Sequence, residues 1–356
     1  MNTPRPSAPP LRSSAERRGD PVNTPRPSAP IRLGTRASVL ARTQSGHVAD
    51  ALSKALGREV VLVEVTTDGD VNGAPLASFG STGVFVSALR ESLLRGDVDV
   101  AVHSLKDLPT APAAGITLAA VPTREDPRDV LVARDGLTLG ELPAGARVGT
   151  GAPRRVAQLG ALGLGLELVP LRGNVDTRIG RVRSGDLDGV VLARAGLERL
   201  GRADEATETL DPIQVLPAPG QGALAVECRA EDPLAADVRR ALDDPDTRAC
   251  VTAERVVLAD LEAGCSAPVG ALADVVEGDA GPELWLRAVA LSPDGALSVR
   301  LSGSGPLQDP EAVGHALAGR MVEDGASRLL DDTPFASSTA TSSTASPHDS
   351  ETRRQP

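Results

Sequence analysis

The stretch ARVGTGAPRRVAQLGALGLGLELVPLRGNVDTRIGRVRSGDLDGVVLARAGLERLG, residues 146–201, decides the fold class of this chain. Three short apolar runs within it, 146–150, 166–171 and 188–193, alternate with segments that have the polar faces of helices. Such alternation is typical of βαβ units whose strands are buried and largely parallel. The stretch therefore predicts an α/β fold.

The same alternation begins at Ile31, with further apolar runs at 60–65, 99–104, 116–121 and 129–134. Beyond Asp211 the pattern changes. A long helix within 246–264 is predicted to end at Gly264, and it is followed by strand-like runs at 269–276, 283–291 and 296–303 and then by one helix from about Pro310 to Leu330. This change predicts a separate, small α+β domain at the C-terminal end.

Composition limits the function classes. The chain has 356 residues, of which 41% are hydrophobic, enough for two or three domains with buried cores. Its net charge of −11 argues against a general nucleic-acid binder, and we expect no nucleic-acid partner. There is no apolar run long enough to span a membrane and no apolar secretory signal, which predicts a cytoplasmic protein without a membrane partner.

The two ends of the chain have the composition of disordered segments. NTPRPSAP occurs at 2–9 and again at 23–30, which indicates a duplicated leader rich in Pro, Arg and Ser. Such segments contain too little apolar surface to offset the entropy lost on ordering. We therefore expect residues 1–30 and 331–356 to be disordered.

The three cysteines, Cys228, Cys250 and Cys265, are 22 and 15 residues apart. This spacing contains no C-x-x-C pair, and an odd number cannot form disulfides completely. We expect three free thiols and no metal site.

Polar side chains follow the predicted strands, where open α/β sheets bind ligands. HSLKDLP, 103–109, places Ser104, Lys106 and Asp107 in a loop that leaves a strand. Taken alone, such a loop is more often a structural turn with a local Lys–Asp pair.

Arginines recur at successive turns from strand to helix. Pro153 suits a first helical position, so Arg154 and Arg155 fall in the first turn, where a cation costs about 0.3–1 kcal/mol. Arg172, Arg178 and Arg199 also follow strands. An anionic ligand near these arginines would make their position favourable. The sequence contains no G-x-x-x-x-G-K-[ST] loop, which would indicate a nucleotide phosphate. The pattern predicts a cleft for carboxylates, which guanidinium groups can bind with two hydrogen bonds.

The chain resembles the porphobilinogen deaminase family, also called hydroxymethylbilane synthase. The resemblance extends from about Ile31 to Leu330, and the motifs that carry it are, in order, HSLKDLP, GTGAPRR, LRGNVDTR, ARAGLERLG, PAPGQGALAVEC and TAERVVLADLEAGCSAPVG. Six motifs in the same order make the resemblance specific.

The resemblance implies an enzyme that condenses four porphobilinogen molecules head to tail, releases ammonia at each step, and hydrolyses off linear hydroxymethylbilane for tetrapyrrole biosynthesis. It implies a dipyrromethane cofactor attached to Cys265 by a thioether, and Asp107 as the catalytic carboxylate. The other residues that it implies in cofactor binding are Ser104, Lys106, Asp107, Arg154, Arg155, Arg172 and Arg199. Those that it implies in substrate binding are Arg36, Ser38, Arg172, Arg178 and Gln221.

The residues around Cys265 favour a covalent anchor over an activated nucleophile. If Gly264 ends a helix, the negative end of the helix dipole does not favour a thiolate at the next residue. A cysteine taken alone is more often a small buried hydrophobe, and we expect this role for Cys228 and Cys250.

The family resemblance implies three domains and a monomer. Domain 1 is expected at 31–122 plus 222–242, domain 2 at 127–217, and domain 3, which carries Cys265, at 245–330. Domains 1 and 2 are expected to resemble type II periplasmic binding proteins and to form the cleft.

Three positions depart from the family pattern. Thr82 stands where many relatives carry lysine, and Gly151 and Ala152 replace a common serine pair, which predicts altered cofactor contacts. Two alternatives remain at this point, a non-catalytic relative and a ligand-binding module of the periplasmic-binding type. Asp107 and Cys265 argue against the first. A module of the second type would lack Cys265 and would normally carry an export signal.

Overall fold

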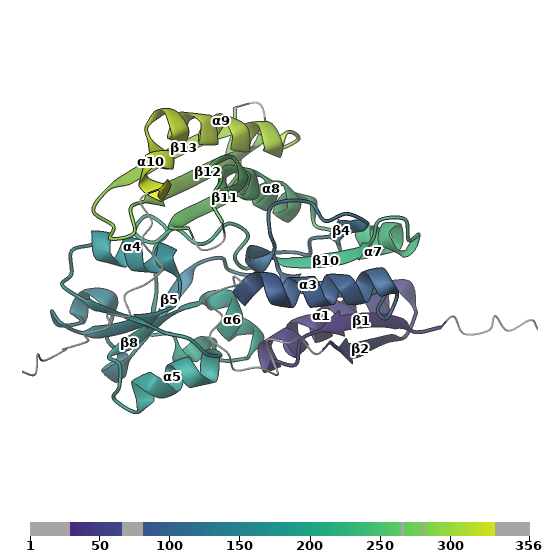
Figure 1. The fold of residues 1–356 in the computed structure, drawn as a ribbon, viewed down its shortest axis with the longest axis horizontal. Helices are drawn as coiled ribbons and strands as arrows, with labels where there is room; N and C mark the ends of the chain where they lie inside the picture. The colour runs from purple at the N-terminus through teal and green to yellow at the C-terminus, as the bar shows by residue number, and fades with distance from the viewer. Residues whose placement is uncertain (1–28, 66–80, 265–266, 280, 332–356) are drawn as a thin grey trace, which may run out of the picture.

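The computed structural model describes residues 29–65, 81–264, 267–279 and 281–331, with the backbone alone for 81–85 and 331. The described chain forms two five-stranded sheets and one three-stranded sheet (Figure 1). In spatial order, the first sheet is β2 (Val60–Glu64), β1 (Ile31–Thr35), β3 (Val100–Ser104), β10 (Leu224–Arg229) and β4 (Ile116–Ala120). The second is β7 (Glu167–Pro170), β6 (Arg147–Thr150), β8 (Gly189–Ala193), β5 (Asp129–Ala133) and β9 (Glu208–Thr209). The third is β11 (Val269–Gly278), β12 (Gly281–Leu291) and β13 (Ser298–Pro306).

Strand direction in the two larger sheets is mixed. β1 is parallel to β2 and β3, whereas β10 is antiparallel to β3 and β4. Likewise β6 is parallel to β7 and β8, whereas β5 is antiparallel to β8 and β9. The predicted α/β class is confirmed. The prediction of largely parallel strands holds for four of the five strands in each of these sheets. β5 and β10 run the opposite way, because they enter their sheets from segments 121–128 and 210–223, which cross between the sheets.

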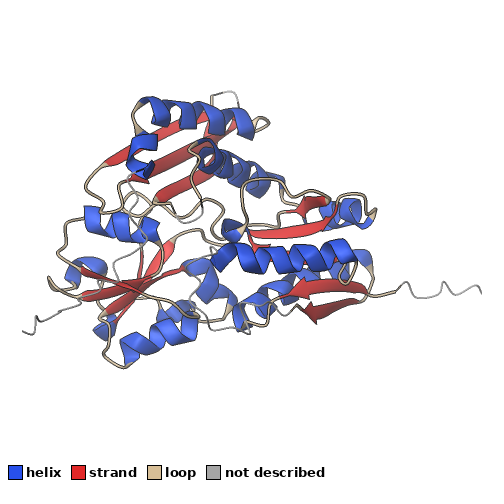
Figure 2. Ribbon diagram, viewed as in Figure 1, coloured by secondary structure: helices blue, strands red, loops and turns tan. Residues whose placement is uncertain are grey.

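Helices connect the strands and cover the sheets (Figure 2). In chain order they are α1 (Val39–Leu56), α3 (Ser81–Arg95), α4 (Pro153–Ala161), α5 (Val175–Arg183), α6 (Arg194–Arg199), α7 (Leu234–Leu242), α8 (Pro245–Asp260), α9 (Pro310–Glu323) and α10 (Ala326–Asp331). Single 3-10 turns lie at Leu105–Asp107, Arg134–Gly136, Leu139–Glu141 and Ala203–Glu205. Side chains begin two of the long helices, because Ser38 accepts a hydrogen bond from the amide of Ala41 and Asp244 accepts one from that of Thr247.

Burial separates central strands from edge strands. β3, β5, β8 and β10 are almost entirely buried, whereas β2 and β7 lie at sheet edges and are half-exposed. The expectation of buried strands therefore fails at 60–65 and 166–171. Apolar composition alone does not distinguish an edge strand from a central one.

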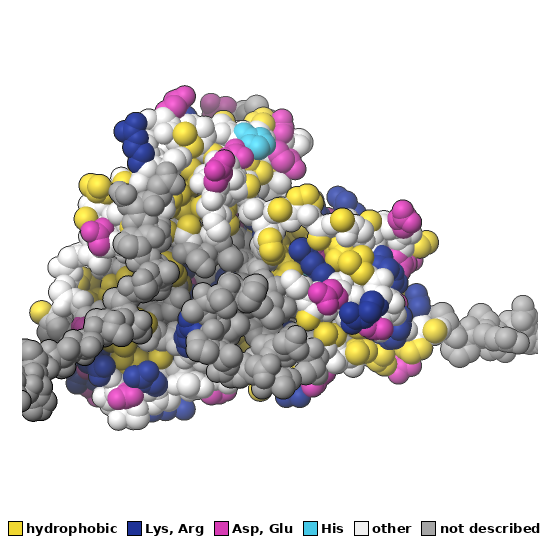
Figure 3. Space-filling view, viewed as in Figure 1, with side chains coloured by type: hydrophobic (Ala, Val, Ile, Leu, Met, Phe, Trp, Pro, Cys, Tyr) yellow, Lys and Arg dark blue, Asp and Glu magenta, His cyan; other side chains and the backbone are white. Residues whose placement is uncertain are grey.

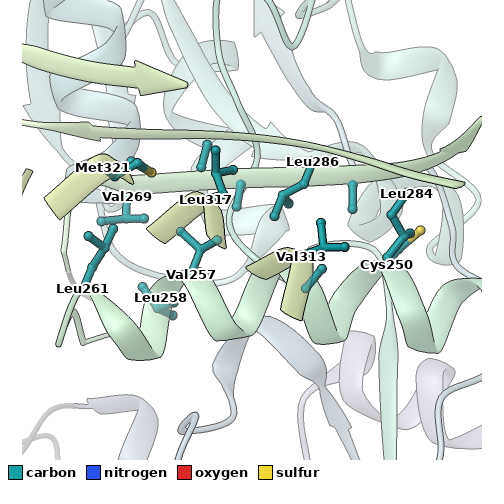
Figure 4. Close-up of a cluster of buried hydrophobic side chains, with 14 of the residues drawn as sticks. Cys250, Val257, Leu258, Leu261, Val269, Leu284, Leu286, Val313, Leu317 and Met321 are labelled. Atoms are coloured by element: carbon teal, nitrogen blue, oxygen red, sulfur yellow. The ribbon is translucent and has the colours of Figure 1, made fainter. Parts of the chain in front are cut away.

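The third sheet packs against α8 and α9 through a cluster of apolar side chains (Figure 4). Val257, Leu286 and Met321 in this cluster are fully buried. α8 and α9 approach so closely that a Cβ atom at Gly314 would lie 2.6 Å from the Cβ of Val256. Glycine at this position is therefore what permits the helix contact that supports the sheet.

Two helix predictions are wrong in part. The helix expected over 310–330 is broken into α9 and α10, with Gly325 at φ +91° between them. α8 ends at Asp260, before Gly264. Glu262 adopts the left-handed conformation with φ +51°, and the amide of Ala263 donates to the carbonyl of Leu258, which closes the helix.

Within the described residues, no helix is both long and apolar enough to cross a membrane. Figure 3 shows acidic and basic side chains interspersed over one face of the molecule. No large basic surface is visible on that face, which agrees with the negative net charge.

Candidate functional site

A cavity of about 400 Å³ lies between the first and second sheets. Its lining follows the carboxyl ends of β1, β3, β7 and β8, where ligands of open α/β sheets bind. The predicted site residues that line it are Arg36, Ser38, Ser104, Lys106, Asp107, Arg155, Arg178 and Arg199. Arg154, Arg172 and Gln221 are not among the lining residues, and Cys265 lies outside the described residues.

The loop after β3 presents Lys106 and Asp107 to the cavity. β3 ends at Ser104, and Leu105–Asp107 form one 3-10 turn. The amide of Leu105 donates to the carbonyl of Ala223 at 3.0 Å, and the amide of Leu108 donates to the carbonyl of Leu105 at 3.1 Å. The first bond ties the turn to the segment that leads into β10, and the second closes the turn on itself.

Asp129 is a buried carboxylate that the sequence analysis did not identify as a site residue. Its side chain has no exposure, and it accepts hydrogen bonds from Arg154 Nη2 at 2.8 Å, Arg155 Nη2 at 2.7 Å and Gln221 Nε2 at 2.8 Å. Burial alone raises the pKa of this carboxyl, but Arg154 and Arg155 lower it by more, so its pKa lies well below the usual range. Asp129 is therefore a permanent anion at the start of β5.

Asp129 changes the interpretation of the two arginines in the first turn of α4. Their unfavourable position at a helix N-terminus is compensated by a carboxylate of the chain itself. Arg154 uses its other terminal nitrogen on the carbonyl of Leu216, and Arg155 donates Nη1 to the carbonyl of Val191 at 2.9 Å. Arg155 Nε is buried without a hydrogen-bond partner in the described part of the chain. Of this pair, only Arg155 lines the cavity.

Lys106 is connected to Asp129 through Gln221. Lys106 Nζ donates to Gln221 Oε1 at 3.3 Å, and Gln221 Nε2 donates to Asp129 and to the carbonyl of Pro127 at 2.7 Å. Burial lowers the pKa of the Lys106 ammonium to about 8, with Arg155 adding to the decrease and Asp107 opposing it. Lys106 can therefore change protonation state near neutral pH.

Arg178 and Arg199 add two more cations to the cavity wall. Arg178 Nε donates to the carbonyl of Gly173 at 2.8 Å, and Arg199 Nη2 donates to that of Gly222 at 2.5 Å. Burial lowers the pKa of both guanidinium groups. Within the ranges that the structure describes, neither has a carboxylate within salt-bridge distance, whereas Arg172 is exposed and outside the lining. The wall thus holds cations that lack a carboxylate from the described chain.

His103 lines the cavity and contacts a second buried carboxylate that sequence reasoning missed. His103 Nε2 lies 3.2 Å from Glu227 Oε2, and Arg90 donates to both oxygens of Glu227 at distances down to 2.6 Å. Burial raises the pKa of Glu227, but His103 and Arg90 lower it to about 2. The signal available in sequence was a single acidic residue in an apolar run for each of Asp129 and Glu227.

The structure gives a steric reason for one departure from the family pattern. A Cβ atom at Gly151 would lie 2.4 Å from the carbonyl oxygen of Leu171, so serine at this position would require the turn to move. The amide of Ala152 donates to Thr150 Oγ1 at 3.4 Å. The side chain of Thr82 lies outside what the structure describes.

Cys228 and Cys250 are free and buried, as predicted. Burial raises the pKa of each thiol to about 12. Both are therefore protonated and unreactive at neutral pH.

Replacing Asp129 with asparagine is expected to lower the free energy of unfolding by about 3–5 kcal/mol at pH 7, because two buried guanidinium groups lose their carboxylate. Since the folded-state pKa of Asp129 is lowered, its contribution is complete above its unfolded pKa of about 4 and is lost as the pH falls further. The difference between wild type and variant should therefore shrink in acid.

Urea unfolding at neutral and acidic pH measures this difference. The exposed Asp50 on α1 is a matched control, and Asp50→Asn should change stability by less than about 0.5 kcal/mol. A difference between wild type and Asp129→Asn that grows in acid would contradict the assignment of Asp129 as the anion.

Two family profiles match this chain. Residues 31–237 match "Porphobilinogen deaminase, dipyromethane cofactor binding domain", and residues 248–323 match "Porphobilinogen deaminase, C-terminal domain". Among distant solved structures, an arginine-specific periplasmic binding protein of Salmonella typhimurium is 17% identical, with a TM-score of 0.36 over 60% of this chain and 92% of that one. The L-cystine solute receptor of Neisseria gonorrhoeae is 15% identical, with a TM-score of 0.36 over 59% and 84%.

Curated relatives are much more similar. Porphobilinogen deaminase 1 of Streptomyces coelicolor is 59% identical over 309 residues, which are 84% of this chain and 97% of the relative. Porphobilinogen deaminase of Nocardia farcinica is 58% identical over 306 residues, 85% and 88% of the two chains. That of Mycobacterium tuberculosis is 58% identical over 305 residues, 84% and 98%. Together with the profiles, these identities show that the chain belongs to the porphobilinogen deaminase family.

Proposed function

We propose that this chain condenses four porphobilinogen molecules head to tail on a covalent dipyrromethane primer, releases ammonia at each step, and hydrolyses off linear hydroxymethylbilane. The observation that carries this conclusion is the 59% identity to a porphobilinogen deaminase over 97% of that protein's length. Hydroxymethylbilane is the linear precursor from which tetrapyrroles are made. Identity at this level does not favour a non-catalytic relative or a periplasmic-binding-type module.

The cavity fits the chemistry of dipyrromethane, whose two pyrroles carry acetate and propionate groups. Arg155 Nε is buried and has no hydrogen-bond partner among the described residues, and the guanidinium groups of Arg178 and Arg199 are desolvated. These groups suit carboxylates, because each can form charge-assisted hydrogen bonds to them. When bound, dipyrromethane supplies the pyrrole carbon to which the first substrate is joined. We propose Cys265 as its attachment point, through a thioether.

We propose that the predicted residues divide the binding between them. Arg155, Arg199, Ser104 and Lys106 would hold the primer, and Arg36, Ser38 and Arg178 would bind substrate carboxylates. Arg154 and Gln221 would support the cavity wall without contacting the ligand, since both contact Asp129 and neither lines the cavity. Arg172, which is exposed, would bind carboxylates of the growing polypyrrole outside the cavity.

Asp107 is proposed as the catalytic carboxylate. When ammonia leaves porphobilinogen, positive charge develops on the substrate pyrrole, and a fixed carboxylate in a partly desolvated cavity stabilises that charge. The same group can accept a pyrrole N–H proton. Lys106, with a pKa of about 8, is beside it and holds a second exchangeable proton.

We propose the domain boundaries 31–122 plus 222–242, 127–217 and 245–330. Each proposed unit contains one of the three sheets, and the crossing segments fall at the boundaries, which supports the division. A monomeric, cytoplasmic enzyme is proposed on the family resemblance.

Intact-protein mass spectrometry, combined with a turnover assay, tests the function. The purified chain is expected to be heavier than its sequence by two linked pyrroles, and it should convert porphobilinogen to hydroxymethylbilane with four ammonia molecules released per product. An active chain without added mass would refute the primer, and a loaded chain without turnover would refute the reaction.

A further inference from the structure

One face of α8 packs against the part of the chain that carries Asp107. Arg248, Val251 and Arg255 recur at spacings of three and four residues and therefore share that face. Val251 is 2% exposed and belongs to the same buried cluster as Leu105 and Leu108. α8, which packs against the third sheet, therefore also packs against the 3-10 turn Leu105–Asp107, which is called the catalytic turn below.

Arg255 binds the carbonyl groups on both sides of Asp107. Its Nη2 donates to the carbonyl of Pro109 at 2.7 Å, and its Nη1 donates to that of Leu108 at 3.0 Å and to that of Leu105 at 3.4 Å. The carbonyl of Leu105 also accepts from the amide of Leu108, whereas those of Leu108 and Pro109 follow the C-terminal end of the 3-10 turn, where backbone acceptors lack helical partners and a cation is favourable. One guanidinium group therefore fixes three points of the turn.

The charged guanidinium of Arg255 binds the carbonyls of this turn. Burial lowers the pKa of its guanidinium, Arg90 lowers it further, and Glu227 raises it. Among the residues described here, no carboxylate lies within salt-bridge distance of Arg255. A half-buried cation that is bonded to backbone carbonyls loses much of its hydration, so its hydrogen bonds must be well formed.

We propose that Arg255 is a positioning residue for Asp107, which sets the direction of the carboxylate by holding the carbonyls of Leu105, Leu108 and Pro109. The proposal rests on the role given above to Asp107. It also connects two parts of the proposed chemistry, because α8 ends at Asp260, five residues before Cys265. The helix that leads to the proposed anchor also supports the catalytic turn.

Arg248 provides a matched control on the same face of α8. Its Nη2 donates to the carbonyls of Leu118 and Ala119 at 3.3 and 3.1 Å, and its Nε donates to Asp243. It is half-buried like Arg255 and also joins α8 to the first sheet, but its carbonyl partners lie in β4. Its loss should cost stability without moving the catalytic turn.

The test compares Arg255→Met and Arg248→Met by amide hydrogen exchange and by kinetics of the cofactor-loaded enzyme. In Arg255→Met, the amide of Leu108 should exchange faster, and kcat should fall at least about tenfold with KM within about threefold, since small displacements of catalytic groups are costly. Arg248→Met should leave both the exchange at Leu108 and kcat within about twofold of wild type.

If Arg255→Met does not fold or does not take up the cofactor, Arg255→Lys provides the test instead. A lysine can reach part of the carbonyl set with a charged donor, so it should restore part of kcat. Equal kcat and equal exchange at Leu108 in wild type, Arg255→Met and Arg255→Lys would overturn the proposal. If Asp107→Asn were inactive but Arg255→Met fully active, the positioning role of Arg255 would be refuted and the catalytic role of Asp107 would stand. Active Asp107→Asn would refute the proposed role of Asp107, while the exchange data would still report on the turn.

Discussion

Cys265→Ser is expected to yield a folded protein that carries no pyrrole adduct and forms no product. A hydroxyl is nearly isosteric with a thiol but is a much weaker nucleophile, so the thioether to dipyrromethane cannot form. The two remaining thiols cannot substitute for it. Cys228 and Cys250 are buried, and burial raises the pKa of each thiol to about 12. Intact mass and product formation are the two measurements.

Cys250→Ser is the matched control, because it removes a buried thiol from the apolar cluster that packs against the third sheet. It should retain the adduct and turn over once folded, and its effect should be a loss of stability from placing a hydroxyl among apolar side chains. An adduct on the Cys265→Ser protein would show that another residue is the anchor.

β1, β9 and β10 were not among the apolar runs predicted from the sequence. The other seven strands of the two larger sheets, β2 to β8, were predictable because each is a short apolar run that is recognisable on its own. The directions of β5 and β10 were not, since direction depends on how the chain crosses between sheets, and the sequence pattern of a strand is the same either way. Edge and central positions were also not predictable. A short apolar run forms β2 at an edge and another forms β3 nearer the centre, and their composition does not distinguish the two positions.

The side chains of the cavity were predictable where one motif carries them. Ser104, Lys106 and Asp107 are consecutive or nearly so, and the end of β3 brings all three to the cavity. Asp129 is different, because its partners are 25, 26 and 92 residues away in the chain. No local pattern indicates such a carboxylate, which binds Arg154 Nη2 at 2.8 Å, and Arg154 is not among the residues that line the cavity.

The end of α8 illustrates how a local rule can fail. Glycine is the usual residue in a left-handed helix cap, so Gly264 was the expected end. Glu262 adopts that conformation instead, and the helix ends at Asp260. The dipole argument for Cys265 is correspondingly weaker, because the effect of a helix dipole decays within about one turn.

Asp107→Asn is expected to fold, to accept cofactor more slowly, and, once loaded, to turn over at least about two orders of magnitude more slowly than wild type, the scale of a lost electrostatic or proton-transfer group. Asparagine preserves the shape of the side chain but removes the charge that stabilises a cationic pyrrole. The loss should appear in kcat more than in KM, because the charge develops in the transition state. Asp107→Glu keeps the charge, displaced by one methylene, and should retain partial activity.

The pH dependence of the two variants distinguishes charge from shape. Asp107 raises the pKa of Lys106, which is about 8 in the wild type, so removing the carboxylate should lower the pKa of Lys106 further. The alkaline limb of the rate profile should therefore shift to lower pH in Asp107→Asn and stay near its wild-type position in Asp107→Glu. Steady-state rates must be measured on protein already shown by mass to carry the cofactor, since loading uses related chemistry. If loaded Asp107→Asn turned over at the wild-type rate with an unshifted alkaline limb, Asp107 would be a structural turn residue paired with Lys106, and the catalytic charge would have to come from another carboxylate.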